Sequence, residues 1–351
     1  MNTLLPTATV GSLPKPSWLA ETEKLWPQWK LEGDALFTAK QDALRVTVQE
    51  QIEAGMDILS DGEQTRQHFV TTFTENLAGV DFEKRTTRRI RNRYDAEVPS
   101  IVGPVSRKNP VFVEQARFLR QLTNRPIKWT LPGPMTMIDT LYDGYYQNRE
   151  ALAMVFADIL NQEAKELAEV GVDIIQFDEP AFNVFIDEVD AWGVPALNRA
   201  IEGLSCESAV HICYGYGIKA NTEWKKTLGS QWRQYETTFP SLQQSNIDII
   251  SLEYQNSNVP MALMELIRGK KVMVGAIDVA THQIETPEAV ATTLRKALPF
   301  VDVDKLYPCT NCGMLPLPRP VAQKKLKALH DGARLLRREL TGSGPDKTGL
   351  T

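Results

Sequence analysis

The stretch Val210-His211-Ile212-Cys213-Tyr214-Gly215 follows an apolar run, alternates in character and ends in glycine. This pattern predicts a short buried strand. Alternate side chains of a strand point to the same face, so His211 and Cys213 are expected to project together at its C-terminal end. Imidazole and thiolate are preferred zinc ligands. A buried cysteine beside a satisfied core histidine is the alternative interpretation of the same pair.

Two further strand-like segments end in residues that bind zinc. Glu253 ends the run Ile249-Ile250-Ser251-Leu252-Glu253, and the turn Cys309-Thr310-Asn311-Cys312-Gly313 supplies two thiols. Together with His211 and Cys213, these residues favour a metal site over a chance pair. The pattern alone leaves open whether Cys309 or Cys312 is the ligand.

The segments around these residues alternate between strand and helix along the chain. We expect eight strands, at 7–10, 56–60, 127–131, 174–177, 210–215, 249–253, 271–277 and 306–308. Helices are expected at 34–55, 65–77, 110–124, 149–170, 189–203, 231–245, 259–268, 287–298 and 320–339. This alternation predicts a (β/α)₈ TIM barrel, with a basic, solvated, β-hairpin-like excursion at 81–109 between the second and third strands. Residues 1–340 are expected to form a single catalytic domain, and residues 341–351 a disordered tail.

The distribution of the candidate site residues decides between a barrel and a doubly wound open sheet. They come after the predicted strands, where a barrel would gather them on one face; they are Gly11, Ser12, Glu63, Asp178, His211, Cys213, Glu253, Asp278 and Cys312. Neither a Gly-x-Gly-x-x-Gly turn after the first strand nor a Walker loop is present, which disfavours the nucleotide-binding folds.

The composition narrows the class of protein. The 351 residues carry a net charge of −5, which gives no basic surface for nucleic acid. Four cysteines in a chain of this length indicate free thiols in a reducing compartment rather than a disulfide framework. No apolar run approaches 18 residues and no signal peptide is apparent, so we expect a cytoplasmic protein that does not bind membranes.

Several motifs resemble the catalytic C-terminal domain of cobalamin-independent methionine synthase, here in a single-barrel form. The resemblance runs from Thr9 to Gly313, and its motifs are Val10-Gly11-Ser12, Asp61-Gly62-Glu63, Gly133-Pro134-Met135-Thr136, Ile175-Gln176-Phe177-Asp178-Glu179-Pro180-Ala181, His211-x-Cys213 and Asn311-Cys312-Gly313. The resemblance implies a TIM barrel and a methyltransferase that makes methionine.

The same resemblance assigns roles to individual residues. It implies that zinc is bound by His211, Cys213, Glu253 and Cys312. Homocysteine would lie against Val10, Gly11 and Ser12, with Glu63 and Asp178 holding its amino group. Either carboxylate could instead cap a following helix.

The chain departs from the family where the methyl donor would bind. Thr140 aligns with the tryptophan that packs on folate, Val184 with the glutamate that holds the pterin, and Tyr94-Asp95 with an Arg-Cys pair. Ala280 stands in place of the proton-donor histidine, and His282, two residues later, is a candidate for that catalytic role or a residue of a solvated loop. The family's full-length synthase also has an N-terminal barrel, whereas this chain begins at the catalytic one.

These departures predict a zinc-dependent homocysteine S-methyltransferase whose donor is not polyglutamyl methyltetrahydrofolate. A corrinoid protein, another partner protein or a small methylated compound could supply the methyl group. The alternatives are a zinc methyltransferase that acts on another thiol with a corrinoid-protein donor, and a zinc or thiol-binding module without turnover.

Overall fold

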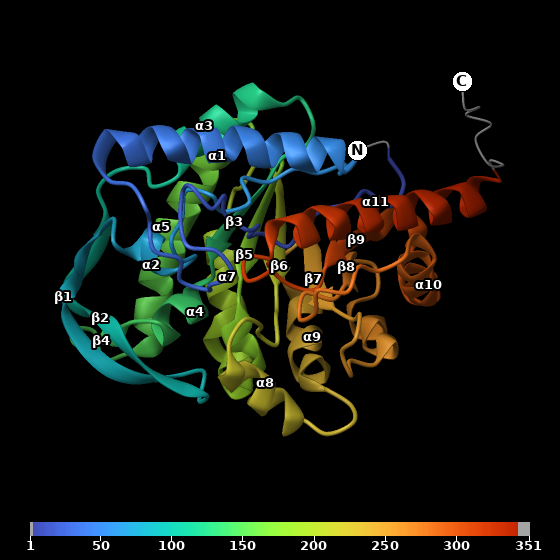
Figure 1. The fold of residues 1–351 in the computed structure, drawn as a ribbon. Helices are drawn as coiled ribbons and strands as arrows, with labels where there is room; N and C mark the ends of the chain where they lie inside the picture. The colour runs from blue at the N-terminus through green and yellow to red at the C-terminus, as the bar shows by residue number, and fades with distance from the viewer. Residues whose placement is uncertain (1–2, 343–351) are drawn as a thin grey trace.

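A six-stranded parallel sheet forms the centre of the molecule in the computed structural model, which describes residues 3–342 (Figure 1). Its strands, in spatial order, are β3 (Lys128–Pro132), β5 (Ile174–Asp178), β6 (Glu207–His211), β7 (Ile249–Glu253), β8 (Lys271–Ile277) and β9 (Leu306–Thr310). β5, β7 and β8 are rich in β-branched residues, and all six strands are almost fully buried, as expected for a parallel sheet covered by helices.

Two extended segments near the N-terminus join the edges of this sheet. Ala8 donates its N–H to the Pro308 carbonyl at 3.0 Å, next to β9, and Ile58 donates to the Thr7 carbonyl at 3.0 Å. Leu59 in turn forms a parallel bridge with Ile127, just before β3. The predicted first and second strands are therefore present as short extended segments at the expected places in the barrel, although their pairing is too sparse for a continuous ladder.

Helices surround the sheet (Figure 1). The longer ones are α1 (Gly33–Glu53), α3 (Val113–Leu122), α5 (Arg149–Glu169), α7 (Val194–Ala200), α8 (Lys219–Lys226), α9 (Gln234–Gln244), α10 (Pro287–Ala297) and α11 (Arg319–Thr341). The short ones are α2 (Thr71–Thr74), α4 (Pro134–Asp139), α6 (Ile186–Glu188), the π-helix Val189–Gly193 and the 3₁₀ helices at Pro180–Asn183, Met261–Ile267 and Val303–Lys305. None of the helices in residues 3–342 combines the length and the apolar character needed to span a bilayer.

The barrel interior is filled by mostly small or branched side chains from successive strands. One buried cluster includes Ala8, Ile58, Ile174, Ala209, Ile249, Met273, Tyr307 and Cys309. Side chains of this kind fill the layers of a TIM barrel. The polar ends of the strands therefore lie above a packed interior and not above a pore.

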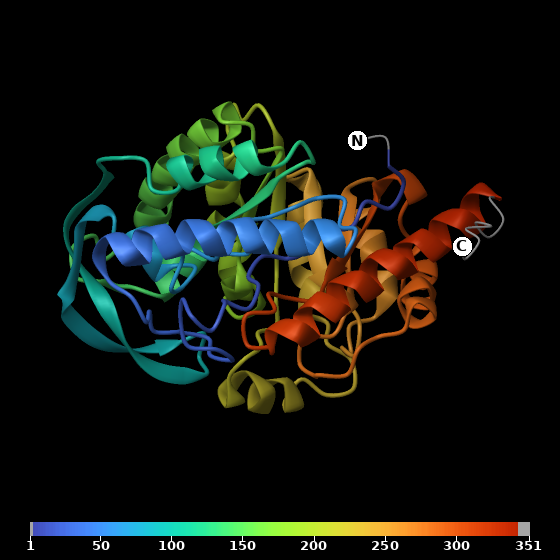
Figure 2. The same cartoon turned by 45° about the horizontal axis from the view of Figure 1, so that its top comes forward.

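The excursion between the second and third strands is a long antiparallel hairpin. Strands β1 (Leu77–Ile90) and β2 (Tyr94–Arg107) pair along most of their length, and β4 (Tyr142–Asp143) adds to β2. Figure 2 shows the hairpin as a curved ribbon on the left side of the molecule, and its tip lies close to α8. The expected solvated hairpin is wrong at its tip, because Ile90, Arg91 and Arg93 are buried against the barrel.

Other expectations about helices and strands also need correction. The predicted helix at 65–77 is reduced to α2, which is consistent with the low helix propensity of its four threonines and one valine. Strand β6 ends at His211 and not at residue 215, so Cys213 lies in the extended segment that follows the strand. Helix α8 was not predicted. The predicted disordered tail falls almost entirely on residues 343–351, which lie outside the described residues.

Candidate active site

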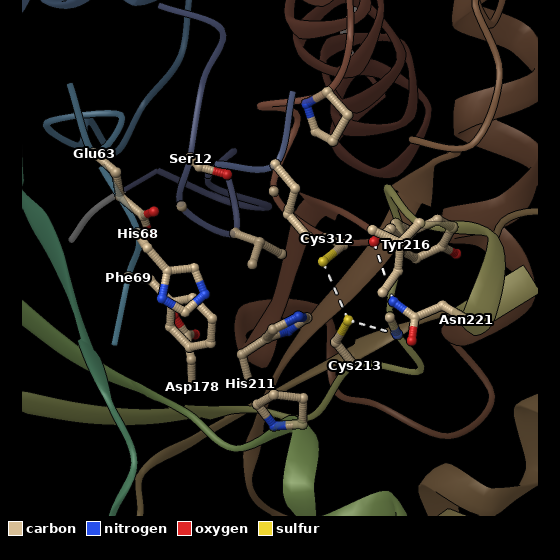
Figure 3. Close-up of a pocket in the computed structure, with 18 of the residues that line it drawn as sticks. Ser12, Glu63, His68, Phe69, Asp178, His211, Cys213, Tyr216, Asn221 and Cys312 are labelled. Carbon is tan, nitrogen blue, oxygen red and sulfur yellow. Dashed lines mark hydrogen bonds between the residues drawn. The ribbon is translucent and has the colours of Figure 1, made fainter. Parts of the chain in front are cut away.

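A pocket opens where the strands end and gathers most of the predicted site residues (Figure 3). Its lining includes Val10, Gly11, Ser12, Glu63, Asp178, His211, Cys213 and Cys312. These residues come from both ends and the middle of the chain, and the parallel strands bring them together as the barrel interpretation requires.

Three of the predicted zinc ligands form a compact group. One ligand atom each from His211, Cys213 and Cys312 lies within 4.8 Å of the others. The two sulfur atoms are 3.2 Å apart, well beyond the S–S length of a disulfide, and both cysteines are free. Of the two cysteines left open by the sequence, Cys312 joins the group, whereas Cys309 is fully buried in the barrel interior.

The imidazole of His211 is oriented for a metal. Its Nδ1 lies 3.0 Å from Ser251 Oγ, while its Nε2 is buried and has no hydrogen-bond partner in the described chain. An unpaired buried nitrogen is costly, and a metal bound at Nε2 would remove that cost. A hydrogen bond at the opposite ring nitrogen is the usual arrangement of a metal-binding histidine. The residues present therefore fit zinc.

The two thiols differ in acidity. The pKa of Cys213 lies well below its usual value because the Cys312 thiol hydrogen-bonds to it, with His211 also favouring the thiolate. The backbone N–H of Gly215 donates to Cys213 Sγ at 2.9 Å and supports the same charge. Sharing the proton with Cys213 raises the pKa of Cys312. A thiolate is the form that binds a metal.

Glu253 ends β7 close to this group but is not part of it. Its carboxylate accepts hydrogen bonds from the Tyr214 N–H at 2.6 Å and from the Tyr216 hydroxyl, and Lys225 Nζ is 3.7 Å away. Burial raises the pKa of Glu253 to about 7. The structure thus places the fourth predicted ligand beside the cluster, with other partners for its oxygens.

Glu63 is held rigidly at the wall of the pocket. It has a left-handed backbone conformation, with φ of 55°, which is unusual for a residue other than glycine. Thr130 Oγ1 donates to its carboxylate at 2.9 Å, and Lys15 Nζ donates to its carbonyl oxygen at 2.9 Å. These contacts fix the carboxylate in the pocket, and no helix-capping hydrogen bond is formed by its side chain within the described residues.

Asp178 lies at the end of β5 and also lines the pocket. Gln176 Nε2 donates to its Oδ1 at 2.7 Å. Burial raises the pKa of Asp178 to about 7, with nearby Glu63 adding to the effect. Two buried carboxyl groups facing one cavity make a site that favours a cation such as an ammonium group.

The segment Val10-Gly11-Ser12 forms an adjacent wall. The Val10 carbonyl accepts from Lys128 Nζ and from Gln176 Nε2, the latter at 2.9 Å. A Cβ at Gly11 would lie 2.8 Å from Glu63 Oε1, so a side chain there would displace the carboxylate. The glycine therefore allows the backbone to approach Glu63 closely.

His282 is the predicted site residue that the structure leaves apart. It is exposed and lines a neighbouring pocket with Asp278, Val279 and Ala280. That pocket shares Gly215 and Tyr216 with the main one, but His282 is not among the residues that surround the zinc ligands.

The sequence interpretation missed several lining residues. They are Leu25, Trp26, His68, Phe69, Arg91, Tyr216 and Asn221. Most lie in loops or at the hairpin tip, where no periodic pattern indicates burial. A local signal was available for the loop Arg91-Asn92-Arg93, which joins the paired residues Ile90 and Tyr94, because asparagine tolerates the positive φ found there, 47° at Arg91 and 55° at Asn92.

Comparisons with known proteins agree with this geometry. A family model described as the catalytic domain of the cobalamin-independent synthase matches residues 5–335. A methionine synthase of Sulfolobus acidocaldarius is 31% identical over 349 residues, which cover 99% of this chain and 97% of the relative.

Solved structures extend the likeness. A B12-independent methionine synthase from Shewanella sp. W3-18-1, in complex with selenomethionine, is 71% identical with a TM-score of 0.95, covering 97% of this chain and all of that one. A putative vitamin-B12 independent methionine synthase from Listeria monocytogenes has the same fold, at 20% identity and a TM-score of 0.73 over 95% of this chain and 99% of that one. These matches span almost the whole sequence, and the chain belongs to the cobalamin-independent methionine synthase family.

Proposed function

We propose that this protein is a zinc-dependent methyltransferase that converts homocysteine to methionine. The observation that carries the proposal is the group formed by His211, Cys213 and Cys312 beside the carboxyl pair Glu63 and Asp178, within one pocket. A metal site for a thiol and a cation site for an ammonium group suit an amino acid that carries both. The names of the relatives and the selenomethionine bound to the Shewanella enzyme support the same product.

The chain's own residues would bind and orient the substrate. Glu63 and Asp178 would hold the ammonium group of homocysteine, and Val10, Gly11 and Ser12 would line its backbone end. His211 Nε2, the two thiolates and Glu253 would hold zinc, whose charge would remove the proton of the substrate thiol while leaving its sulfur nucleophilic. A free aliphatic thiol is mostly protonated at neutral pH and reacts poorly.

Glu253 suits the position that must open when the substrate sulfur binds. Its carboxylate is the hardest of the four ligands, and hydrogen bonds from Tyr214 and Tyr216 give it alternative partners. A ligand that can leave without becoming an unpaired buried charge costs less to displace. We therefore assign the exchangeable position to Glu253.

We further propose that the methyl donor is not polyglutamyl methyltetrahydrofolate. Thr140 and Val184 stand where the family has its folate-contacting tryptophan and glutamate, and neither is among the lining residues of the pocket. Thr140 instead turns its hydroxyl to the Thr136 carbonyl. An aromatic stack contributes about 0.5–1.5 kcal/mol beyond burial and a charged hydrogen bond about 1.5–3 kcal/mol, so their loss weakens folate affinity by about two to three decades.

The test is turnover of the zinc-loaded protein with homocysteine and methyltetrahydrofolate. We expect little or no methionine, measured by mass spectrometry. The same preparation should bind homocysteine with release of a proton, seen by calorimetry in buffers of different ionisation enthalpy. Rapid methionine formation from methyltetrahydrofolate would contradict the donor assignment, and binding without dependence on the buffer would contradict thiol activation.

Relatives that act on other thiols and modules without turnover are not favoured. The paired carboxyl groups have no role for a thiol that lacks an ammonium group, and the relatives that this chain matches over 97% of their length carry the name methionine synthase.

A further inference from the structure

The proposed function leaves one half of the pocket without a role. That half is lined by Leu25, Trp26, His68, Phe69, Arg91 and Tyr94. Figure 3 shows His68 and Phe69 on the same side as Glu63 and Asp178, apart from the sulfur atoms of Cys213 and Cys312. A methyl donor must enter from a side of the bound sulfur that the zinc ligands do not occupy, so these residues are candidates for the donor subsite.

An aromatic wall makes up one part of this half. The rings of Trp26 and His68 stack with centroids 5.2 Å apart at 26°, and Phe69 lies 4.9 Å from His68. His68 is neutral, because burial and the charge of Arg91 lower its pKa to about 3. Its Nδ1 accepts the Thr71 N–H at 3.3 Å. Neutral aromatic faces attract a cation, above all one with methyl groups.

Arg91 places a positive charge beside this wall. No other arginine and no lysine is found among the described residues that line the pocket. Its side chain is only 10% exposed; its Nε lies 3.6 Å from Asp139 Oδ2 and makes no hydrogen bond within residues 3–342. The Asp139 carboxylate is shared with the Arg91 backbone N–H, at 3.2 Å from both oxygens. A nearly buried guanidinium with unused donors is suited to a carboxylate.

The leaving group gives a further restriction. A methyl group bound to a neutral amine leaves only if that amine gains a proton, whereas one bound to a sulfonium or quaternary ammonium centre leaves with no proton. His68 is held neutral with its Nδ1 already used, and His282 lies outside the pocket. Glu63 and Asp178 are assigned to the substrate ammonium group. With His211 assigned to zinc, no histidine among the described pocket residues is left to supply an acid for a neutral amine.

We propose that the methyl donor is a small onium compound bearing a carboxylate, bound with its methylated cation against Trp26, His68 and Phe69 and its carboxylate on Arg91. The inference rests on the proposed homocysteine methyltransferase function and names the donor class for the same site. The cavity itself has a volume of about 120 Å³, and together with its solvent-open mouth the pocket offers about 810 Å³ of space, part of it needed by homocysteine. The remaining space suits a molecule of amino-acid size better than a corrin ring.

The transfer is balanced without any other reactant. The lone pair of the homocysteine thiolate forms the new S–CH₃ bond as the bond between methyl and the onium centre breaks. That bonding pair returns to the donor, which leaves as a neutral thioether or tertiary amine that keeps its carboxylate. No proton and no electron enters or leaves.

A matched pair of donors tests the class directly. Zinc-loaded full-length protein is given homocysteine with methyl-deuterated dimethylsulfoniopropionate or with the corresponding propionamide, which has the same sulfonium centre and no carboxylate. Glycine betaine and choline form a second pair. We expect deuteromethyl-methionine from the carboxylate compound of at least one pair, with kcat/KM about tenfold or more above that of the partner cation that lacks a carboxylate.

Variants of the hairpin test whether Arg91 causes the preference for donors that carry a carboxylate. Arg91→Met should reduce the carboxylate preference to near unity, and Arg91→Lys should keep part of it, while homocysteine affinity stays unchanged in both. Arg89→Met is the matched control, since Arg89 lies on the same hairpin but is exposed, and its preference should equal that of the unmodified protein. The donor pair itself needs no variant, so a misfolded Arg91 variant does not prevent the test.

The following results would overturn the inference. They are no transfer from any of the four onium compounds, a carboxylate preference that survives in Arg91→Met, and turnover confined to methylcobalamin or methyltetrahydrofolate. A loss of homocysteine affinity in Arg91→Met would place the substrate carboxylate on Arg91 and would also overturn it. Zinc content and homocysteine binding are measured on the same samples, and failure there would instead contradict the proposed function.

Discussion

At the scale of single residues, the hydrogen bonds of His211 distinguish a metal ligand from an ordinary core histidine. His211 uses Nδ1 on Ser251 and leaves Nε2 buried without a hydrogen-bond partner among the described residues. A core histidine packed for stability alone would have both nitrogens satisfied or one exposed. This difference favours the metal interpretation over that of a satisfied core residue.

The two cysteines of the last turn provide a direct test at this scale. Cys312→Ser should lose zinc, because its sulfur lies 3.2 Å from that of Cys213, while Cys309→Ser should keep one zinc per chain. The Cys309 side chain is buried in the barrel interior, where burial raises its pKa to about 11 and keeps it a thiol. Metal content after dialysis is the measurement. Equal zinc loss in both variants would mean that the fourth ligand is misassigned.

Residues at strand ends could be predicted from sequence, and residues in loops could not. His211, Cys213, Glu63 and Asp178 follow apolar runs, so the barrel alone places them at one face. Trp26, His68 and Arg91 reach the same pocket through irregular segments whose path depends on tertiary contacts. No local periodicity encodes such contacts, and they appear only in the folded structure.

At the scale of elements, the β1–β2 hairpin is the part that differs most from its expected role. Its tip packs on the loop after β6: Arg93 Nη1 donates to the Tyr214 carbonyl and to Asn221 Oδ1, each at 2.9 Å. The Arg93 guanidinium also lies 3.5 Å from the centre of the Trp224 ring. The hairpin therefore fastens the segment that carries Cys213, in addition to lining the pocket with Arg91 and Tyr94.

The base of the hairpin is held by a buried ion-pair cluster. Arg107 donates to Glu163 and Glu166, each at 2.6 Å, and Glu163 also accepts the N–H groups of Val111 and Phe112. Arg107→Met would leave the buried Glu163 carboxyl group without its cation. We expect the free energy of unfolding to fall by about 3–5 kcal/mol.

Urea denaturation measures this loss, with Arg89→Met as the control on the same hairpin. The Arg89–Asp95 pair is exposed, so that variant should change stability by less than about 0.5 kcal/mol. Equal stability of Arg107→Met and Arg89→Met would show that the cluster does not anchor the hairpin.

Helix and strand prediction succeeded where the pattern was long and amphipathic. Helices α1, α5, α10 and α11 begin and end within two residues of their expected bounds. The failures lie in short segments, such as 65–77, where threonines and a turn outweigh the apolar spacing. The position of the hairpin tip could not be predicted from the sequence either, because it depends on contacts with residues more than 100 positions away.

At the scale of the whole molecule, buried carboxyl groups link stability to pH. Glu179 is fully buried beneath α4, where it accepts from the N–H groups of Met135 and Thr136 at 2.9 Å each. Burial raises its pKa from 4.5 to about 8. The folded protein therefore binds more protons than the unfolded chain between these values, so the free energy of unfolding falls as the pH rises through this interval.

Glu179→Gln should be less stable overall, because an amide nitrogen cannot accept the Thr136 N–H, but its stability should depend less on pH. We expect the slope between pH 4.5 and 8 to differ from that of the unmodified protein by up to about 1.4 kcal/mol per pH unit. Denaturant unfolding at a series of pH values measures it. Glu114→Gln, at an exposed carboxylate, should keep the original slope, and parallel curves for all three proteins would contradict the linkage.

The central claim is that homocysteine sulfur joins zinc in a site built by His211, Cys213, Glu253 and Cys312. X-ray absorption at the zinc edge, with and without homocysteine, tests it most directly. We predict two sulfur neighbours at about 2.3 Å in the zinc-loaded protein and three after homocysteine is added, with one oxygen neighbour lost as Glu253 leaves. A zinc ion that keeps two sulfur neighbours in both samples would contradict the account.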